Sequence, residues 1–418
     1  MSTAAKTEYN YSDVALAETY TDQTRLDAIF TDMRKNAPIA LIDHPDFDSF
    51  WAITKHADIV EIERHNDLFI NDPRAVLQDK ATEAAVLEAT GGSHLLLRTL
   101  IHMDNPDHKT YRGLTQNWFL PGSLRDWEPK IQALAKMFVD RMAGMDGACD
   151  FAQDIAVWYP LRVVMMILGV PEEDEARMLR LTQELFGAQD EELQREKSDT
   201  EDSDTISDFF MYFTQITEDR RANPRDDAAS LIANATIDGE LIGHLEAMSY
   251  YIIIATAGHD TTSSSTSGGL LALIENPEEL AKLKADPSLI GSAVDEMIRW
   301  TTPVKHFMRT ATEDYEIRGQ VIKKGESVML LYPSANKDEE VFEDPFSFKV
   351  DRKQNKHVAF GFGAHLCLGQ YLAKLEMKML LEELLPRLDE IELAGDPSLI
   401  KGSFVSGLKH LPIRYTMS

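Results

Sequence analysis

The sequence predicts a mainly α protein with a smaller β portion, and three observations support this. Apolar residues recur at helical spacing through most of residues 105–300. One such pattern, from Leu241 to Glu275, is long enough for a helix of about 50 Å that would cross the molecule. Short segments of β character, separated by glycine turns, follow Pro303. We expect one domain over residues 1–418, helix-rich in about 105–300 and 365–390 and β-rich in about 39–55, 303–335 and 390–418.

The first part of the chain places a small β segment before a series of helices. Mixed polar segments fill the opening ~45 residues, and Phe50–Thr54 then alternates as a short strand does. Glycine or proline marks several helix ends, as at Gly91-Gly92 and Pro121-Gly122. The predicted helices are about 55–66, 75–90, 107–119, 127–142 and 155–168.

The second part of the chain contains an acidic run and then changes from helical to strand patterns. Nine acidic residues against two basic ones lie between Gln189 and Asp208, which predicts a solvated loop or helix end. Asn276-Pro277 stops the long helical pattern. Shorter helices are predicted at 277–285, 292–300 and 367–385, and strands at 310–312, 315–317, 321–322 and 327–331, with a C-terminal strand region.

Composition and charge exclude several classes of function. Lys and Arg number 42 against 70 Asp and Glu, a net charge of −28, so phosphate backbones and anionic lipid surfaces are repelled. Two cysteines, Cys149 and Cys367, are too few for a disulfide scaffold or a multi-cysteine zinc module. The N-terminus resembles no signal peptide, and the apolar stretches at 163–170 and 250–257 are too short to span a bilayer. We expect a cytoplasmic protein with no nucleic-acid or membrane partner.

The sharpest chemical signal is the run FGFGAHLCLG at residues 360–369, just before a predicted helix. A lone cysteine is more often a small buried hydrophobe than a ligand. Here Cys367 opens the helix, where free N–H groups and the helix dipole favour a thiolate. Gly363 and Gly369 let the backbone approach a flat partner closely. A cysteine thiolate bound to haem iron is the chemistry that fits this pattern.

The run resembles the haem-binding loop of the cytochrome P450 monooxygenases, and the resemblance extends over nearly the whole chain. It implies the P450 fold, with haem b (iron protoporphyrin IX) between the long central helix and the helix after the cysteine loop. Cys367 would be the metal ligand, and Phe360, Gly363 and Gly369 would contact the cofactor. Glu296-x-x-Arg299 matches a second family motif, in which Arg352 would complete a buried structural network.

The segment Ala257–Thr262 interrupts an apolar helix with Gly, His, Asp and Thr, all poor residues for a helix interior. It could be the N-cap of a new helix or a polar face. The family resemblance implies instead a groove for dioxygen, in which Asp260 and Thr261 deliver protons. His259 is expected to point away into a helix contact.

The resemblance also implies partners for the haem and its substrate. His108, Arg112, Arg309 and His365 match the family's propionate-binding positions, since propionates entering a partly apolar site need cationic or hydrogen-bonding partners. Residues 74–100 and 186–213 would form a lid. The residues expected over the haem are Ile253, Thr256, Ala257, Val304, Phe307 and Val405, although each apolar one also suits an ordinary core.

The resemblance implies a monooxygenase that inserts one atom of O2 into a small or medium hydrophobic substrate. Residues 300–309, 332–336 and 368–370 look most like bacterial members that oxidise monoterpene alcohols such as terpineol, and a compact aromatic substrate is an open alternative. Electrons would come from a separate ferredoxin and its reductase. The basic candidates for that contact are Lys109, Arg112, Lys356 and Lys374. A peroxide-driven or nitric-oxide-reducing haem–thiolate enzyme and a haem gas sensor are the alternatives.

Overall fold

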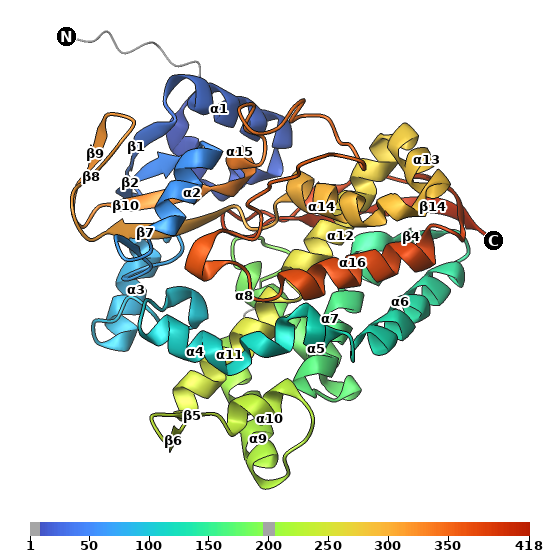
Figure 1. Cartoon of the computed structure of the whole chain (residues 1–418), viewed down its shortest axis with the longest axis horizontal. Coiled ribbons are helices and arrows are strands. Elements are labelled where there is room, and N and C mark those ends of the chain that lie inside the picture. Colours follow the sequence, from blue (N-terminus) through green and yellow to red (C-terminus); the bar gives the residue numbers. More distant parts are fainter. Residues whose placement is uncertain (1–8, 195–204) are drawn as a thin grey trace.

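The computed structural model describes residues 9–194 and 205–418. Helices dominate it, and the strands form separate groups in different parts of the molecule (Figure 1). The predicted mainly α class with a smaller β portion is therefore confirmed. The first helices are α1 (Gln23–Asn36), α2 (His56–Arg64), α3 (Lys80–Thr90), α4 (Asp107–Thr115), α5 (Pro121–Leu124), α6 (Glu128–Ala143), α7 (Trp158–Leu168) and α8 (Glu175–Phe186). The later ones are α9 (Thr205–Ala222), α10 (Ala228–Ala233), α11 (His244–Ala257), α12 (Asp260–Glu275), α13 (Pro277–Ala285), α14 (Ile290–Thr301), α15 (Tyr332–Ala335) and α16 (Gln370–Leu384).

The main sheet joins segments that lie far apart in the sequence. It has five strands in the order β1-β2-β10-β7-β3, with β10 parallel to β2 and antiparallel to β7. Met308 of β7 pairs with Met329 of β10, and both side chains are buried. Its strands are β1 (Ile39–His44), β2 (Phe47–Ile53), β3 (Phe69–Ile70), β7 (His306–Ala311) and β10 (Ser327–Leu331).

The remaining strands form small ribbons. A three-stranded sheet in the order β11-β14-β4 ties the C-terminus to the chain between α6 and α7. Its strands are β4 (Ala148–Asp150), β11 (Leu388–Leu393) and β14 (Pro412–Met417). The two-stranded ribbons pair β5 (Thr236–Ile237) with β6 (Glu240–Leu241), β8 (Tyr315–Ile317) with β9 (Gln320–Ile322), and β12 (Ser398–Leu399) with β13 (Leu408–His410).

The expected continuous helix over 241–275 is wrong, because the chain forms two helices, α11 and α12. The break falls at Gly258 and His259, where the bond from the Gly258 N–H to the Ile254 carbonyl stretches to 3.3 Å. The Ala257 carbonyl accepts instead from the hydroxyl of Thr261, at 2.8 Å. Side-chain hydroxyls that compete for backbone carbonyls are a known cause of such interruptions.

Packing brings the helices α12 and α16 into one region. α12 packs against α14, and α16 packs against α6 and α14, so the chain after the cysteine loop and the broken helix share a buried core (Figure 1). Several boundaries differ from the predictions; for example, α3 begins at Lys80 rather than near 75, capped by Asp79, and α16 begins at Gln370 rather than Cys367. Within residues 9–194 and 205–418, no helix is apolar over a length that would cross a bilayer.

Candidate active site

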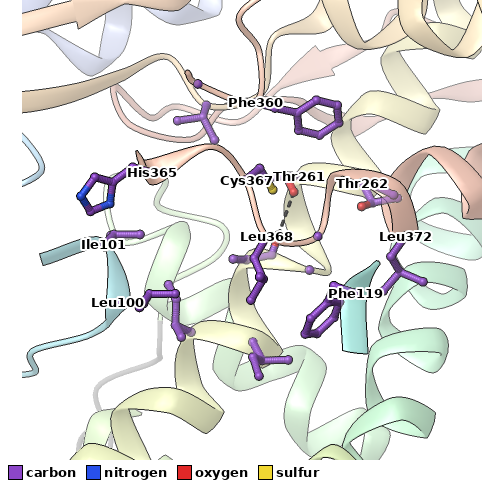
Figure 2. Close-up of a pocket in the computed structure, with 18 of the residues that line it drawn as sticks. Leu100, Ile101, Phe119, Thr261, Thr262, Phe360, His365, Cys367, Leu368 and Leu372 are labelled. Atoms are coloured by element: carbon purple, nitrogen blue, oxygen red, sulfur yellow. Dashed lines mark hydrogen bonds between the residues drawn. The ribbon is translucent and has the colours of Figure 1, made fainter. Parts of the chain in front are cut away.

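A large cavity lies between the cysteine loop with α16 on one side and α11–α12 on the other. Together with its opening to solvent, the space between them amounts to about 1550 Å³. Figure 2 shows Cys367, His365 and Phe360 on the loop side and Thr261 and Thr262 among the other lining residues.

The cysteine loop is closed by its own backbone, since the Cys367 N–H donates to the Phe360 carbonyl at 2.9 Å. Phe360 and Gly369 line the cavity with Cys367, and a Cβ on Gly369 would meet nothing within 4 Å. Gly363 does not line it, contrary to the expected close approach to a cofactor. Its φ is +70°, and a Cβ there would lie 2.5 Å from the Glu63 carbonyl oxygen, so glycine is needed to pack the loop on α2.

Cys367 is a free cysteine, and several hydrogen-bond donors lie near its sulfur. Burial raises the pKa of its thiol above the ordinary value, while the N–H groups of Gly369 and Gln370 and the Arg112 guanidinium act in the opposite direction. Such donors stabilise a thiolate sulfur. Within the described part of the chain no three His, Cys, Asp or Glu side chains gather as a metal cluster, so one sulfur on a cofactor-bound metal fits better than an all-protein site.

The four expected propionate partners, His108, Arg112, Arg309 and His365, all line this cavity. Arg112 donates to the Leu366 carbonyl at 2.7 Å, and Arg309 donates to the carbonyl of its neighbour Met308. His108 is 2% exposed, and its Nε2 has no hydrogen-bond partner among the described residues. Burial lowers the pKa of His108 to about 4 and that of His365 to about 2, with nearby guanidinium groups adding to the shift.

These features pass a test of fit to haem. A single sulfur with backbone donors would hold the metal of the cofactor, and the cationic and imidazole groups at the same cavity suit two carboxylates. The unpartnered His108 nitrogen is a buried polar atom for which only a bound group in the cavity supplies a partner. The open backbone face at Gly369 leaves room for a flat ring.

Several cavity residues escaped the sequence reading, among them Glu63, Tyr332 and Glu376. Glu63 lies on α2 beside Ile59 and Ile62, so a carboxyl on the apolar face of that helix was the available signal. Glu376 is 1% exposed and neither carboxyl oxygen has a hydrogen-bond partner in the described residues. Burial raises its pKa well above the ordinary value, so it stays protonated.

The two residues expected to deliver protons face different spaces. Thr261 lines the large cavity, whereas Asp260 lines a smaller neighbouring cavity with Gln153, Gln183 and Lys409. His259 is fully buried, with its Nδ1 3.2 Å from the Thr182 hydroxyl and 3.3 Å from Asp260 Oδ1. The start of α12 therefore separates a strongly apolar cavity from a smaller and more polar one.

Four of the six expected substrate-contact residues line the large cavity: Ile253, Ala257, Val304 and Phe307. Thr256 does not, because its hydroxyl turns back to the Ile252 carbonyl at 2.7 Å on the buried side of α11. Val405 does not either, since it forms a β-bridge with Val304 and borders the smaller cavity. Leu100 and Ile101, at the end of the expected first lid segment, do line it. Residues 195–204 of the expected second segment lie outside the described residues.

The expected buried ion-pair network is present. The Arg299 guanidinium donates to Glu296 at 2.7 and 2.8 Å, and Arg352 donates to both oxygens of the same carboxylate. Glu296 and Arg299 are fully buried. Arg299 also reaches the carbonyls of Asn336 and Pro345, at 2.9 Å each, and so fastens α14 to the chain that leads into the cysteine loop.

Comparisons with known proteins agree with this site. The family model "Cytochrome P450" matches residues 71–415. Cytochrome P450-terp of a Pseudomonas species is 47% identical over 412 residues, covering 96% of each chain. The crystal structure of CYP108D1 from Novosphingobium aromaticivorans superposes with a TM-score of 0.90 at 41% identity and covers 98% of both chains. The steroid C26-monooxygenase of Mycolicibacterium smegmatis is 32% identical over 92% of this chain and 89% of its own length. The chain therefore belongs to the cytochrome P450 family, and it is a monooxygenase with haem b as its cofactor.

Proposed function

We propose that this monooxygenase inserts one oxygen atom from O2 into a small or medium hydrophobic substrate, a monoterpenoid or a compact aromatic compound. The observation that carries the proposal is the apolar lining of the cavity on its α11–α12 side. Ile253 and Ala257 of α11 lie there, and Val304, Phe307, Leu100 and Ile101 add apolar side chains from other segments of the lining. Leu100 and Ile101 are labelled in Figure 2. Apolar walls with few polar groups select a ligand by shape and hydrophobic burial.

The related proteins favour the monoterpenoid. The resemblance of residues 300–309 to terpineol-oxidising members agrees with the 47% identity to cytochrome P450-terp. A Mycobacterium marinum P450, 31% identical with a TM-score of 0.87, was solved in complex with pseudoionone. Substrate choice depends on a few pocket side chains, so these relatives support the substrate class and not a particular compound.

The chain's own residues have separable tasks in this reaction. When bound, haem b supplies the iron that activates dioxygen. Cys367 would hold the metal from the loop side, and Arg112, Arg309, His108 and His365 would hold the propionates. The apolar lining excludes water around the substrate, which suppresses side reactions with solvent.

Proton supply would fall to Thr261 and Asp260. The Thr261 hydroxyl gives its hydrogen to the Ala257 carbonyl, which leaves its oxygen free to accept or relay a proton in the large cavity. Asp260 Oδ2 is buried without a hydrogen-bond partner among the described residues and borders the polar cavity beside Lys409. Water in that polar cavity would carry protons to this carboxylate.

Electrons would arrive from a separate acidic ferredoxin and its reductase. Of the four expected basic contacts, Lys109 and Lys356 are exposed. Arg112 is turned into the cavity, and Lys374 pairs with Asp295 at 2.7 Å, so these two are not free surface charges. On a chain of net charge −28, the two exposed lysines beside α4 and the cysteine loop offer a local site for an acidic partner.

A spin-state titration of the purified holoenzyme tests the substrate class. Displacement of an axial water by a substrate changes the haem absorption spectrum, so binding is read without turnover. We expect saturable shifts with monoterpene alcohols or small alkylbenzenes at micromolar concentration and none with long fatty acids or steroids. A shift only with fatty acids or steroids would contradict the proposal.

A further inference from the structure

The second glutamate near the end of α2, Glu63, occupies an unusual place for a carboxyl group. It is 4% exposed and lines the large cavity together with Arg309 and His365. Its Oε1 accepts from the Tyr332 hydroxyl at 2.8 Å and lies 3.4 Å from Arg309 Nη2. Its Oε2 is buried and has no hydrogen-bond partner among the described residues. A buried carboxyl oxygen without a partner is costly unless a bound group satisfies it.

The neighbouring charged groups decide which form of Glu63 the cavity accepts. Arg309 from β7 is the one cation within 4 Å of it in the described structure, and Tyr332 from α15 donates its hydroxyl. From the cysteine loop, the Phe362 N–H and the His365 ring face the same region. Arg64, next on α2, lies over the Phe362 ring instead. From α4, His108 is held neutral by burial.

These opposing influences place the pKa of the Glu63 carboxyl near neutral pH. Burial raises the pKa of Glu63 to about 7, against the smaller lowering by Arg309, Tyr332 and the Phe362 N–H. The bound haem adds a propionate to a site whose cation, Arg309, is already shared with Glu63. Two carboxylates beside one guanidinium repel each other, so ionising both costs free energy. We therefore expect the pair to keep one shared proton.

We propose that Glu63 is a haem-propionate ligand whose Oε2 carries a proton and donates it in a hydrogen bond to a propionate oxygen. The shared proton neutralises one of two neighbouring carboxyl groups while Arg309 neutralises the other. Haem retention and the reduction potential then depend on this proton. Reduction adds an electron near the pair and draws the proton more tightly, so the potential falls as the pH rises through neutrality.

A matched control lies on the same helix. Glu61 Oε1 accepts from the Tyr315 hydroxyl at 2.7 Å, as Glu63 does from Tyr332. Glu61 is not among the residues that line the cavity. Glu61→Gln therefore removes the ionisable carboxyl of a glutamate–tyrosine pair on α2 without reaching the cofactor. Glu63→Gln keeps a hydrogen-bond donor near the propionate but cannot titrate.

Potentiometric titration of the holoenzyme from about pH 6 to about pH 8 tests the proposal. The wild-type protein and Glu61→Gln should show a potential that falls with pH, with a slope of at most about 59 mV per pH unit. Glu63→Gln should lose most of that slope. A reduction-induced infrared difference spectrum should show a protonated carboxyl band in the wild type that is missing from Glu63→Gln. An unchanged slope in Glu63→Gln, or a flat wild-type profile, would overturn the proposal.

Tyr332→Phe supplies a second, independent variant that keeps Glu63. The hydroxyl stabilises the ionised carboxylate, so its removal should move the midpoint of the pH dependence upward. Haem transfer to an apo-globin should also become several-fold faster in Glu63→Leu, which has no donor, than in Glu61→Leu. If the midpoint stays fixed in Tyr332→Phe and the two leucine variants release haem at equal rates, Glu63 does not bind the cofactor.

Discussion

The Thr261 hydroxyl donates a 2.8 Å hydrogen bond to the Ala257 carbonyl, across the break between α11 and α12. The Ala257 carbonyl therefore has a side-chain donor where the helix is interrupted, at Gly258 and His259. The bond also fixes the direction in which the Thr261 oxygen presents its lone pairs, toward the large cavity that it lines. The interruption of the helix thus places the Thr261 hydroxyl in a largely apolar wall.

We predict that Thr261→Ala retains haem but diverts reduced oxygen to peroxide. Without the hydroxyl, the large cavity loses the oxygen that would relay protons, so peroxide released per electron should rise several-fold while substrate binding stays within about twofold. Oxygen consumption, peroxide and product are measured together. Thr262→Ala is the control, because Thr262 lines the same cavity one residue later. Equal coupling in Thr261→Ala and the wild type would show that this hydroxyl has another task.

The Glu296 network predicts a stability effect. Arg352→Met removes one of two guanidinium partners from a fully buried carboxylate, and breaking a buried pair typically costs about 3–5 kcal/mol. Denaturant unfolding should show that loss, with haem released earlier in the transition. Arg414→Met, which breaks an exposed pair with Glu392, should leave the unfolding midpoint nearly unchanged. Similar midpoints for the two variants would mean that the network does not stabilise the cysteine loop.

Most of the fold could be predicted because it depends on local patterns. α13, β8 and β10 begin and end where the periodicity and the turn residues place them. The opening helix α1 and the helices α8 and α9 were not predicted. α8 does carry a clear apolar stripe, whereas the stripe of α9 is weak and packing supplies the rest of its stability. The uninterrupted helix over 241–275 failed because a hydroxyl bond decides that break, and hydropathy does not register it.

The site residues also divide into those that a sequence motif marks and those that only the tertiary structure brings together. Cys367 and the four propionate-side residues were predictable because a family motif fixes them in the sequence, and they do meet at one cavity. Thr256 and Val405 were misplaced, since side-chain direction on a helix or turn depends on hydrogen bonds and bridges formed after folding. Glu63 and Glu376 belong to no motif, and only the tertiary structure brings their carboxyl groups to the cavity.

The corrected pocket makes a prediction of its own. Ile253→Ala removes apolar surface from the cavity and should weaken binding of a monoterpene by about 1–2 kcal/mol, roughly tenfold in the dissociation constant. Thr256→Val changes a side chain on the buried face of α11 and should leave binding nearly unaltered. Spin-state titrations of the two variants with the same ligand decide the matter. A larger effect in Thr256→Val would restore that residue to the substrate site.

Glu376 predicts a dependence of stability on pH. Its pKa in the folded protein lies well above 4.5, the ordinary value for the unfolded chain. The folded state therefore holds the proton more tightly, so this contribution is complete below about pH 4.5 and is lost as the pH rises. Glu376→Gln cannot titrate, so its unfolding free energy should fall less between about pH 5 and about pH 8 than that of the wild type. Urea unfolding at the two pH values measures the difference.

A control for Glu376 lies on the same helix. Glu382 is exposed and pairs with Lys378 at 3.7 Å. Glu382→Gln should retain the pH dependence of the wild-type protein, because the exposed Glu382 side chain stays in contact with solvent in the folded protein. If Glu376→Gln and Glu382→Gln lose equal stability over this range, the buried carboxyl is ionised or hydrated in the folded protein.

The absorption spectrum of the reduced protein with carbon monoxide tests the assignment of Cys367 most directly. A thiolate ligand to haem iron gives a strongly red-shifted Soret band in this state. The wild-type protein and Cys149→Ser, which changes the other free cysteine, should both show that band, and Cys367→His should bind haem without it. A red-shifted band that persists in Cys367→His would contradict the account.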